Sequence, residues 1–251
     1  ILFFLIASTS FGQENFDYRT FTKQMCSQEF QGRGYVNGGD SIAAEYIKNS
    51  FLKMGFKKEM IESQEFYFSV NTFPDTCEVL LAGEKLIPGQ DFIVEPRSAG
   101  TCKKNACRPK TYNVKFISGK HFMEVSRLHL NQFEHLNLNT DDILVVENIN
   151  YSKDSANIIS ALISQYADSW HVIETVDDKF SWSVSSRVGK NLHLKIKSKF
   201  LENNIKGMKI RVHLRNEFKK AHLAKNIIGH VSSKKKAKGT IMITAHYDHL
   251  G

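Results

Sequence analysis

The sequence predicts an α/β protein in which a mixed sheet is flanked by helices and carries a β-rich inserted domain. The run at 239–245 is short, apolar and β-branched at nearly every position, which is typical of a strand buried on both faces of such a sheet. Apolar residues at helical spacing over 40–54 predict a helix with one side in the core. The region 111–222 consists mainly of short β-rich runs, unlike the helical pattern at 40–54 and the continuous apolar run at 239–245. These runs predict the inserted domain.

Two helices are expected near the start of the chain. The first covers 17–30, and the second runs from Asp40, a residue type that caps helix N-termini, to Met54, where Gly55 ends it. The loop at 31–39 is rich in glycine but lacks the setting and the lysine of a P-loop, so phosphate binding is not expected there. The side chains expected in the core are Phe21, Met25 and Phe30 in the first helix, and Ala43, Tyr46, Ile47, Phe51 and Met54 in the second.

Alternating and β-branched runs predict the strands. One strand is expected at 64–73, and a β-hairpin is expected at 78–87 around the turn Ala82-Gly83. The inserted domain contributes one helix, at 155–166. Its expected strands lie at 112–117, 142–147, 170–175, 191–196 and 209–214, of which the alternating 191–196 fits a half-exposed antiparallel strand. The irregular spacing of its histidines suggests no catalytic group among His121, His129, His135, His171 and His213.

The strand at 239–245 leads directly into His246, Tyr247, Asp248 and His249. In open α/β sheets, ligands bind beyond the carboxyl ends of the strands, and His246 lies there. Residues i and i+2 of an extended segment point to the same side, so His246 and Asp248 share one side. A neutral histidine is a common metal ligand and needs a hydrogen-bond acceptor behind its ring. The pattern predicts a metal ligand at His246 with Asp248 as its partner, and a structural role for His249. An ordinary hydrogen-bonded histidine at position 246 is the alternative.

These residues resemble a known family, the co-catalytic (two-zinc) aminopeptidases, which includes glutamate carboxypeptidase-like and glutaminyl cyclase-like relatives. The matching stretch is the Asn-Ile-Ile-Gly strand at 226–229, followed by a loop and then by 241–251. The segments 29–34, 40–54 and 70–74 resemble the amino-terminal part of exported members of the family. The β-rich middle of the chain is similar to the protease-associated domains of exported aminopeptidases.

The resemblance implies that His246 binds zinc and that Asp248 orients its ring. The family holds two zinc ions with further residues, namely a bridging Asp, a Glu general base with an adjacent Glu ligand, and a further Asp and His. All of these would lie after Gly251. Because a catalytic zinc needs three protein ligands and an open position, we expect this chain to be an incomplete and inactive part of the enzyme. The implied organisation is a truncated signal peptide at 1–12, peptidase residues at 13–110 and 223–251, and the protease-associated-like insertion at 111–222.

The first residues of the chain resemble part of a secretory signal. An apolar block at 1–7 precedes Ser10-Phe11-Gly12, which has the small-x-small form of a cleavage site, although a basic n-region is missing. The alternative is an ordinary buried segment. About a dozen residues are too few to span a bilayer, which needs about 20. No cysteine lies at the cleavage point, so no lipid anchor is expected. We therefore expect a mature protein that begins near Gln13, is exported to the periplasm or beyond, and has no stable membrane anchor.

The four cysteines are compatible with an oxidising compartment and allow three pairings. Cys102 and Cys107 are close enough in sequence to close a small surface loop, whereas Cys26 and Cys77 have no near neighbour. A zinc knuckle would need two more ligands nearby, and none is visible in the sequence. A local disulfide, or free thiols, is favoured over a metal site.

The net charge of +8 raises the question of nucleic-acid binding. The positive charge is scattered, however, and its densest run, at 234–238, lies between two predicted strands, where a solvated hairpin loop explains it. Export also argues against a nucleic-acid partner, so none is expected.

The resemblance thus implies an exported zinc-dependent aminopeptidase that removes amino-terminal residues from peptide substrates. One alternative is a glutaminyl cyclase-like or carboxypeptidase-like enzyme on the same scaffold. The other is a relative without catalytic activity that binds peptides or glycans. The sequence does not indicate the oligomeric state or the preferred substrate side chain.

Overall fold

A computed structural model describes residues 16–102, 107–127, 137–181, 183–201, 207–232 and 238–249. The expected signal peptide at 1–12, His129, His135 and most of the lysine run at 234–238 lie outside these residues. The chain divides into two compact units. Unit 1 consists of Ile1–Tyr67 and Leu223–Gly251, and unit 2 consists of Phe68–His222. Within the described part of the chain, no helix has both the length and the apolar character that crossing a membrane requires.

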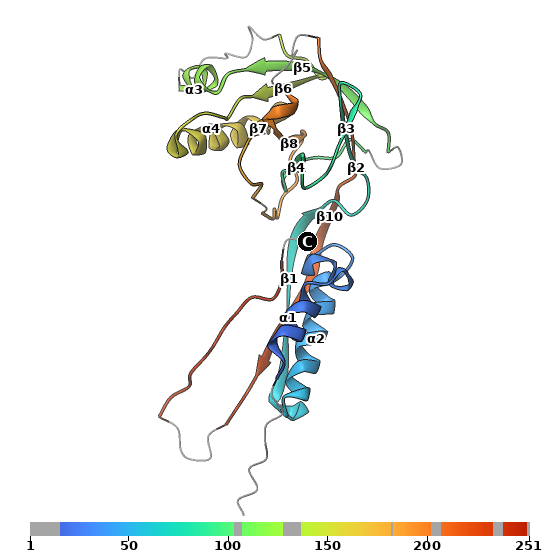
Figure 1. Cartoon of the computed structure of the whole chain (residues 1–251), viewed down its shortest axis with the longest axis vertical. Helices are drawn as coiled ribbons and strands as arrows, with labels where there is room; N and C mark the ends of the chain where they lie inside the picture. The colour runs from blue at the N-terminus through green and yellow to red at the C-terminus, as the bar shows by residue number, and fades with distance from the viewer. Residues whose placement is uncertain are drawn as a thin grey trace, which may run out of the picture. The chain divides into compact units, whose positions relative to one another are not determined.

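Two α-helices form the helical part of unit 1 (Figure 1). Helix α1 covers Tyr18–Met25, and the Asp17 carboxylate caps it by accepting the N–H groups of Arg19 and Thr20. A short 3-10 segment, η1 at Gln28–Arg33, follows, so the helix expected at 17–30 ends earlier than predicted. Helix α2 covers Gly39–Lys53, and a second 3-10 turn, η2, covers Lys58–Met60. Helix α2 matches the second predicted helix, but its N-cap is Gly38 rather than Asp40.

The core of unit 1 is small and lies between α1, η1 and α2. Met25, Phe30 and Ala43 are buried in it. With the residues that pack against it, this cluster confirms the predicted inner side of the first helix and Ala43, Tyr46 and Ile47 of the second, whereas Phe51 and Met54 are not part of it. The partly buried residues that pack against this core are Phe21, Tyr46, Ile47 and Tyr247.

A two-stranded sheet joins the two units along the chain. Its strands are β1 at Ile61–Thr72 and β10 at Glu217–Gly229. Strand β1 confirms the strand predicted at 64–73, and β10 contains the Asn-Ile-Ile-Gly stretch at 226–229. The chain therefore enters unit 2 along β1 and leaves it along β10.

The segment at 239–245 is not a buried strand in the structure, and that prediction is wrong. The described residues from 238 to 249 form no strand, and the side chains of Ile241, Met242 and Ile243 are exposed by 91%, 81% and 93%. A strand is buried only when neighbouring strands satisfy its backbone and other side chains cover its faces. The described residues provide neither for this segment.

Unit 2 is built on a large mixed sheet. The strand order is β3-β2-β9-β5-β6-β7-β8-β4, in which β5, β6, β7 and β8 run parallel and the flanking strands are antiparallel to their neighbours. The strands are β2 at Cys77–Leu81, β3 at Glu84–Leu86, β4 at Phe92–Val94, β5 at Lys110–Ile117, β6 at Asp142–Val146, β7 at Val172–Val176, β8 at His193–Lys197 and β9 at Lys209–Leu214. A 3-10 turn, η4 at Ser198–Phe200, follows β8.

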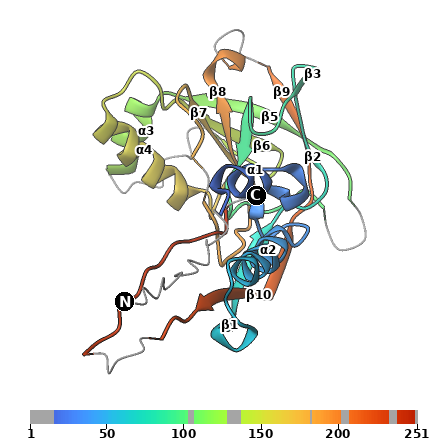
Figure 2. The same cartoon turned by 60° about the horizontal axis from the view of Figure 1, so that its bottom comes forward.

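The two faces of this sheet form separate cores. Successive side chains of a strand point to opposite faces, so Ile143 and Val145 of β6 belong to one apolar cluster and Leu144 and Val146 to the other. Helices α3 at Gly119–Arg127 and α4 at Lys153–Tyr166 cover the second cluster (Figures 1 and 2). The first cluster receives residues from strands across the sheet, including Leu86 of β3 and Phe92 of β4.

The structure confirms most of the predicted elements of unit 2 and corrects several details. The hairpin, the helix at 155–166 and all five predicted strands are present, but α3 was not predicted. The half-exposed antiparallel strand at 191–196 is instead parallel to β7 on one side, and only its pairing with β4 is antiparallel.

Unit 2 starts at Phe68 and ends at His222, and the residues of the predicted insertion, 111–222, lie within it. The reason for the earlier start is that β2 pairs with β9 and β4 pairs with β8, which draws these early strands into the same sheet.

Candidate metal centre

Hydrogen bonds hold the segment that carries His246 and Asp248 against other residues of unit 1. The Arg33 side chain donates from Nε to the Tyr247 carbonyl at 2.9 Å and from a terminal nitrogen to the Met25 carbonyl at 2.5 Å. The His249 backbone N–H donates to the Arg33 carbonyl at 3.0 Å. The Tyr247 hydroxyl donates to the Lys225 carbonyl at 2.5 Å. Arg33 thus supports the segment by donating hydrogen bonds to backbone carbonyls.

His246 and Asp248 lie on the same side of this segment, as the extended geometry predicts. Nδ1 of His246 is 3.1 Å from the backbone carbonyl oxygen of Asp248 and 3.9 Å from its carboxylate oxygen Oδ1. The carbonyl oxygen is within hydrogen-bond distance of Nδ1, and a hydrogen bond donated from Nδ1 to it leaves Nε2 as the nitrogen for a ligand bond. The His246 side chain is 83% exposed.

Asp248 is itself held by a tyrosine. The Tyr35 hydroxyl donates to Oδ2 of Asp248 at 3.0 Å, and burial together with this bond raises the pKa of Tyr35 to about 12. Burial and the carboxylates of Asp40 and Asp248 raise the pKa of Tyr247 to about 12 as well. Both phenols therefore stay protonated at neutral pH, and Tyr35 remains a donor to Asp248. No sequence pattern indicates this role for Tyr35, because it lies far from Asp248 along the chain.

His246 and Asp248 fit the role of one zinc ligand and the residue that orients it. An imidazole with an acceptor behind Nδ1 is the usual arrangement of a zinc-bound histidine. Among the described residues, the three-residue group of potential metal ligands is formed by Cys102, Cys107 and His213 in unit 2, so His246 does not have two further ligands beside it there. His249 contributes its backbone N–H to the Arg33 contact, which agrees with a structural role. A zinc ion at His246 would need ligands from outside the described residues.

Neither the protein-family models nor the curated proteins compared with this sequence match it. Solved structures do. A zinc aminopeptidase from Bacillus subtilis aligns with 87% of this chain and 47% of its own at 15% identity, with a TM-score of 0.53. A peptidase M28 precursor from Shewanella amazonensis SB2B aligns with 92% of this chain and 57% of its own at 11% identity, also with a TM-score of 0.53. The chain has a zinc aminopeptidase-like fold. It spans about half the length of these structures.

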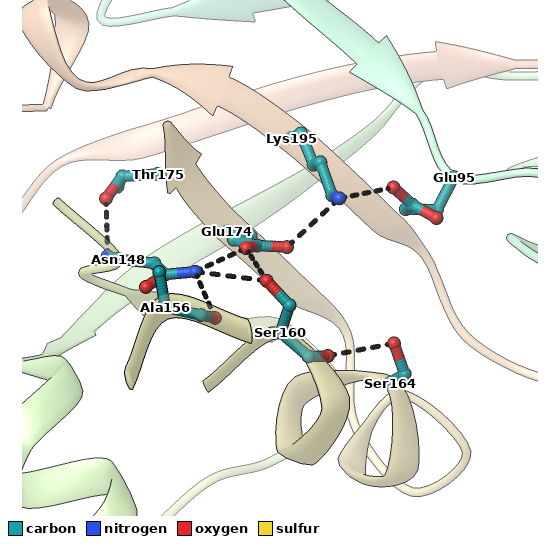
Figure 3. A network of polar contacts seen from close by, with 8 residues as sticks. All are labelled: Glu95, Asn148, Ala156, Ser160, Ser164, Glu174, Thr175 and Lys195. Carbon is teal, nitrogen blue, oxygen red and sulfur yellow. Dashed lines mark hydrogen bonds and ion pairs between the residues drawn. The ribbon is translucent and has the colours of Figure 1, made fainter. Parts of the chain in front are cut away.

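Unit 2 contains a second group of polar residues, a buried charged network (Figure 3). Glu174 of β7 is 2% exposed and accepts hydrogen bonds from Nδ2 of Asn148 at 2.6 Å and from the Ser160 hydroxyl at 2.5 Å. Nζ of Lys195 in β8 is 3.5 Å from Glu174 and 3.0 Å from Glu95. Burial lowers the pKa of Lys195, but the two carboxylates outweigh it and leave the pKa above its usual value. Because each charge has a partner, the network ties α4 to β7 and β8 and serves the fold.

Proposed function

We propose that this chain is the amino-terminal part of an exported, zinc-dependent aminopeptidase, with His246 as a zinc ligand and Asp248 as its positioning residue. The observation that carries the proposal is the contact of His246 Nδ1 with Asp248, which leaves Nε2 for a metal. The fold shared with zinc aminopeptidases supports it. Peptides are the proposed substrates, with no nucleic-acid partner and no stable membrane anchor. Unit 2 is the proposed counterpart of a protease-associated domain.

The residues of this chain would hold a zinc ion and orient the histidine ring that binds it. His246 would bind through Nε2 while its Nδ1–H donates to Asp248, and Tyr35 would keep the Asp248 carboxylate in place. Two zinc ions, when bound, would supply an activated water and polarise the scissile carbonyl. The other ligands and the general base would come from residues after Gly251, so activity is expected of the complete protein and not of this chain alone.

The test is the zinc content and peptidase activity of the complete protein and of matched variants. His246→Ala should remove one zinc ion and abolish hydrolysis of an amino-acid anilide, and Asp248→Asn should lower zinc affinity by about 10–100-fold. His249→Ala is the control, because its backbone N–H makes the observed contact and survives the substitution. A complete protein that binds no zinc, or a His246→Ala variant with full zinc content, would refute the proposal.

The alternatives separate by reaction. A cyclase-like enzyme would convert amino-terminal glutamine to pyroglutamate, and a carboxypeptidase-like enzyme would release carboxyl-terminal residues. A relative that only binds peptides or glycans would lose neither zinc nor ligand on His246→Ala. Reading the coding sequence past Gly251 would distinguish the peptidase from these alternatives before any assay. An Asp, an adjacent Glu pair and a further Asp and His support the peptidase, whereas their absence favours the alternatives.

A further inference from the structure

The disulfide of unit 2 lies against a histidine that the sequence did not connect with it. Cys102 and Cys107 form the predicted local disulfide, while Cys26 and Cys77 are free. Sγ of Cys107 is 3.3 Å from Nε2 of His213 in β9. The two sulfur atoms and one ring nitrogen of His213 all lie within 4.8 Å of one another. Three potential metal ligands therefore meet at one point on the surface of unit 2.

A carboxylate lies behind the histidine. Glu78 of β2 and His213 of β9 are direct partners across the two strands, and Oε2 of Glu78 is 3.7 Å from Nδ1 of His213. A hydrogen bond from Lys85, the charge of Lys85 and the nearby His213 lower the pKa of Glu78, so it is a carboxylate at neutral pH. An imidazole with a carboxylate near one nitrogen and a cysteine sulfur beside the other resembles the arrangement of a metal-bound histidine.

Backbone contacts hold the first cysteine beside β9. The Thr101 N–H donates to the Leu214 carbonyl at 2.8 Å, and the Cys102 N–H approaches the same oxygen at 3.3 Å. The Leu214 N–H donates in turn to the Thr101 hydroxyl at 2.9 Å. None of these bonds uses a sulfur atom, so they persist when the disulfide is reduced. The Cys102 thiol would therefore remain beside β9 after reduction.

We propose that, once the Cys102–Cys107 disulfide is reduced, the two thiolates and His213 Nε2 bind a zinc ion, so that unit 2 carries a redox-controlled metal site. In the first step a small thiol reductant gives two electrons and two protons to the disulfide, which becomes two cysteine thiols while the reductant becomes a disulfide. In the second step Zn²⁺ binds both sulfurs and the imidazole, and two protons leave to solvent. Water takes the fourth position.

The geometry suits this exchange. With Zn–S bonds of about 2.3 Å and Zn–N bonds of about 2.0 Å, sulfur and nitrogen ligands of a tetrahedral zinc lie about 3.5 Å apart. The Cys107 sulfur and His213 nitrogen are already at 3.3 Å. Only the thiolate is a metal ligand, so the disulfide form cannot bind zinc in this way. Cys107 is exposed, which gives a reductant access to the bond.

The test measures zinc uptake by the oxidised and the reduced chain in a His246→Ala background, which keeps the proposed peptidase ligand out of the measurement. The zinc titration uses a chromophoric chelator as competitor and is carried out under anaerobic conditions. Co²⁺ serves as a spectroscopic probe of thiolate bonds. Reduced protein should bind about one more zinc ion than oxidised protein and show thiolate-to-cobalt charge transfer. His213→Ala and Cys107→Ser should abolish this uptake, and Glu78→Gln should weaken it by about 10–100-fold.

Cys77→Ser is the matched control, because Cys77 is a free cysteine on the strand next to His213 and should leave the uptake unchanged. Circular dichroism establishes that each variant is folded, and Glu78→Gln tests the site independently if His213→Ala does not fold. Equal zinc uptake by oxidised and reduced protein would overturn the proposal. So would uptake by the reduced protein that none of the His213, Cys107 and Glu78 variants changes.

Discussion

Strand β6 and the segment at 239–245 are alike in composition and opposite in environment. Both are short, rich in isoleucine, valine or methionine, and lead into polar residues. Strand β6 lies between β5 and β7, and every residue from Ile143 to Val146 is at most 1% exposed. The segment at 239–245 has no strand partner among the described residues, and Ile243 is 93% exposed. Burial thus depends on the neighbours that a segment finds, and β-propensity alone does not secure it.

The same contrast extends to the two units. Unit 2 has an apolar cluster on each face of its sheet, whereas the buried cluster of unit 1 consists of Met25, Phe30 and Ala43. Burying an isoleucine side chain contributes about 1.5–3 kcal/mol, and unit 1 leaves that contribution unused at Ile241 and Ile243. We therefore expect unit 2 to be the more stable unit. An exposed apolar segment of this kind is also where another strand or another protein surface would bind.

The largest expected effect comes from truncating the same residue type in the two segments. Ile143→Ala should lower the free energy of unfolding of unit 2 by about 2–5 kcal/mol, because it leaves a cavity in a fully buried site. Ile243→Ala should change it by less than about 0.5 kcal/mol. Both tryptophans, Trp170 and Trp182, belong to unit 2, so fluorescence during urea unfolding reports on that unit.

Equal losses in the two variants would contradict the comparison. That result would mean that the segment at 239–245 is buried in solution, by a second copy or by residues that the structure does not describe. Analytical ultracentrifugation of Ile243→Ala would then show whether self-association is the reason.

Acid should destabilise unit 2 through its buried histidines. Burial lowers the pKa of His193 to about 4, and its Nε2 has no hydrogen-bond partner among the described residues. Burial also lowers the pKa of His171 to about 4, and Nδ1 of His171 accepts the Leu192 N–H at 3.0 Å. The unfolded chain binds protons near pH 6.5 and the folded chain near pH 4. Stability is therefore complete above about pH 6.5 and decreases as the pH falls toward 4.

His193 alone should account for a loss of roughly 2–3 kcal/mol at about pH 4.5 relative to pH 7, measured by urea unfolding at the two pH values. The comparison is made within each variant, so a general cost of the substitution cancels. His193→Asn should reduce the pH dependence by that amount, whereas His246→Ala, at an exposed site in unit 1, should not. A pH dependence that survives His193→Asn in full would show that protonation of other groups causes it.

Local patterns predicted most of unit 2, and contacts distant in sequence were missed. The strands at 112–117 and 209–214 and the helix at 155–166 follow from periodicity, because each buries one regular face. Helix α3 has only nine residues, of which Phe122 and Val125 are buried, so its apolar pattern is too short to recognise.

The candidate sites show the same limit. The His246 and Asp248 pair is local, since two residues of one extended segment share a side, and the sequence predicted that they lie together. His213 joins Cys102 and Cys107 only because β9 pairs with β2 and the Thr101 backbone bonds to Leu214. The spacing of these residues in the sequence does not predict their contact. The contact between Tyr35 and Asp248 is likewise not predictable from spacing.

The smallest expected effect concerns the hydrogen bond between Tyr35 and Asp248, which holds the residues that follow the exposed segment at 239–245. Tyr35→Phe removes one hydrogen bond to a carboxylate and should weaken the local structure by about 0.5–1.5 kcal/mol. Since burial and this bond raise the pKa of Tyr35 to about 12, the bond is intact at neutral pH. Hydrogen exchange at the His249 amide, which donates to Arg33, should accelerate by up to about tenfold. Tyr18→Phe, at an exposed tyrosine of the same unit, should leave the rate unchanged. If Tyr35→Phe also leaves it unchanged, Arg33 and Tyr247 hold the segment by themselves, and Asp248 is free to turn away from His246.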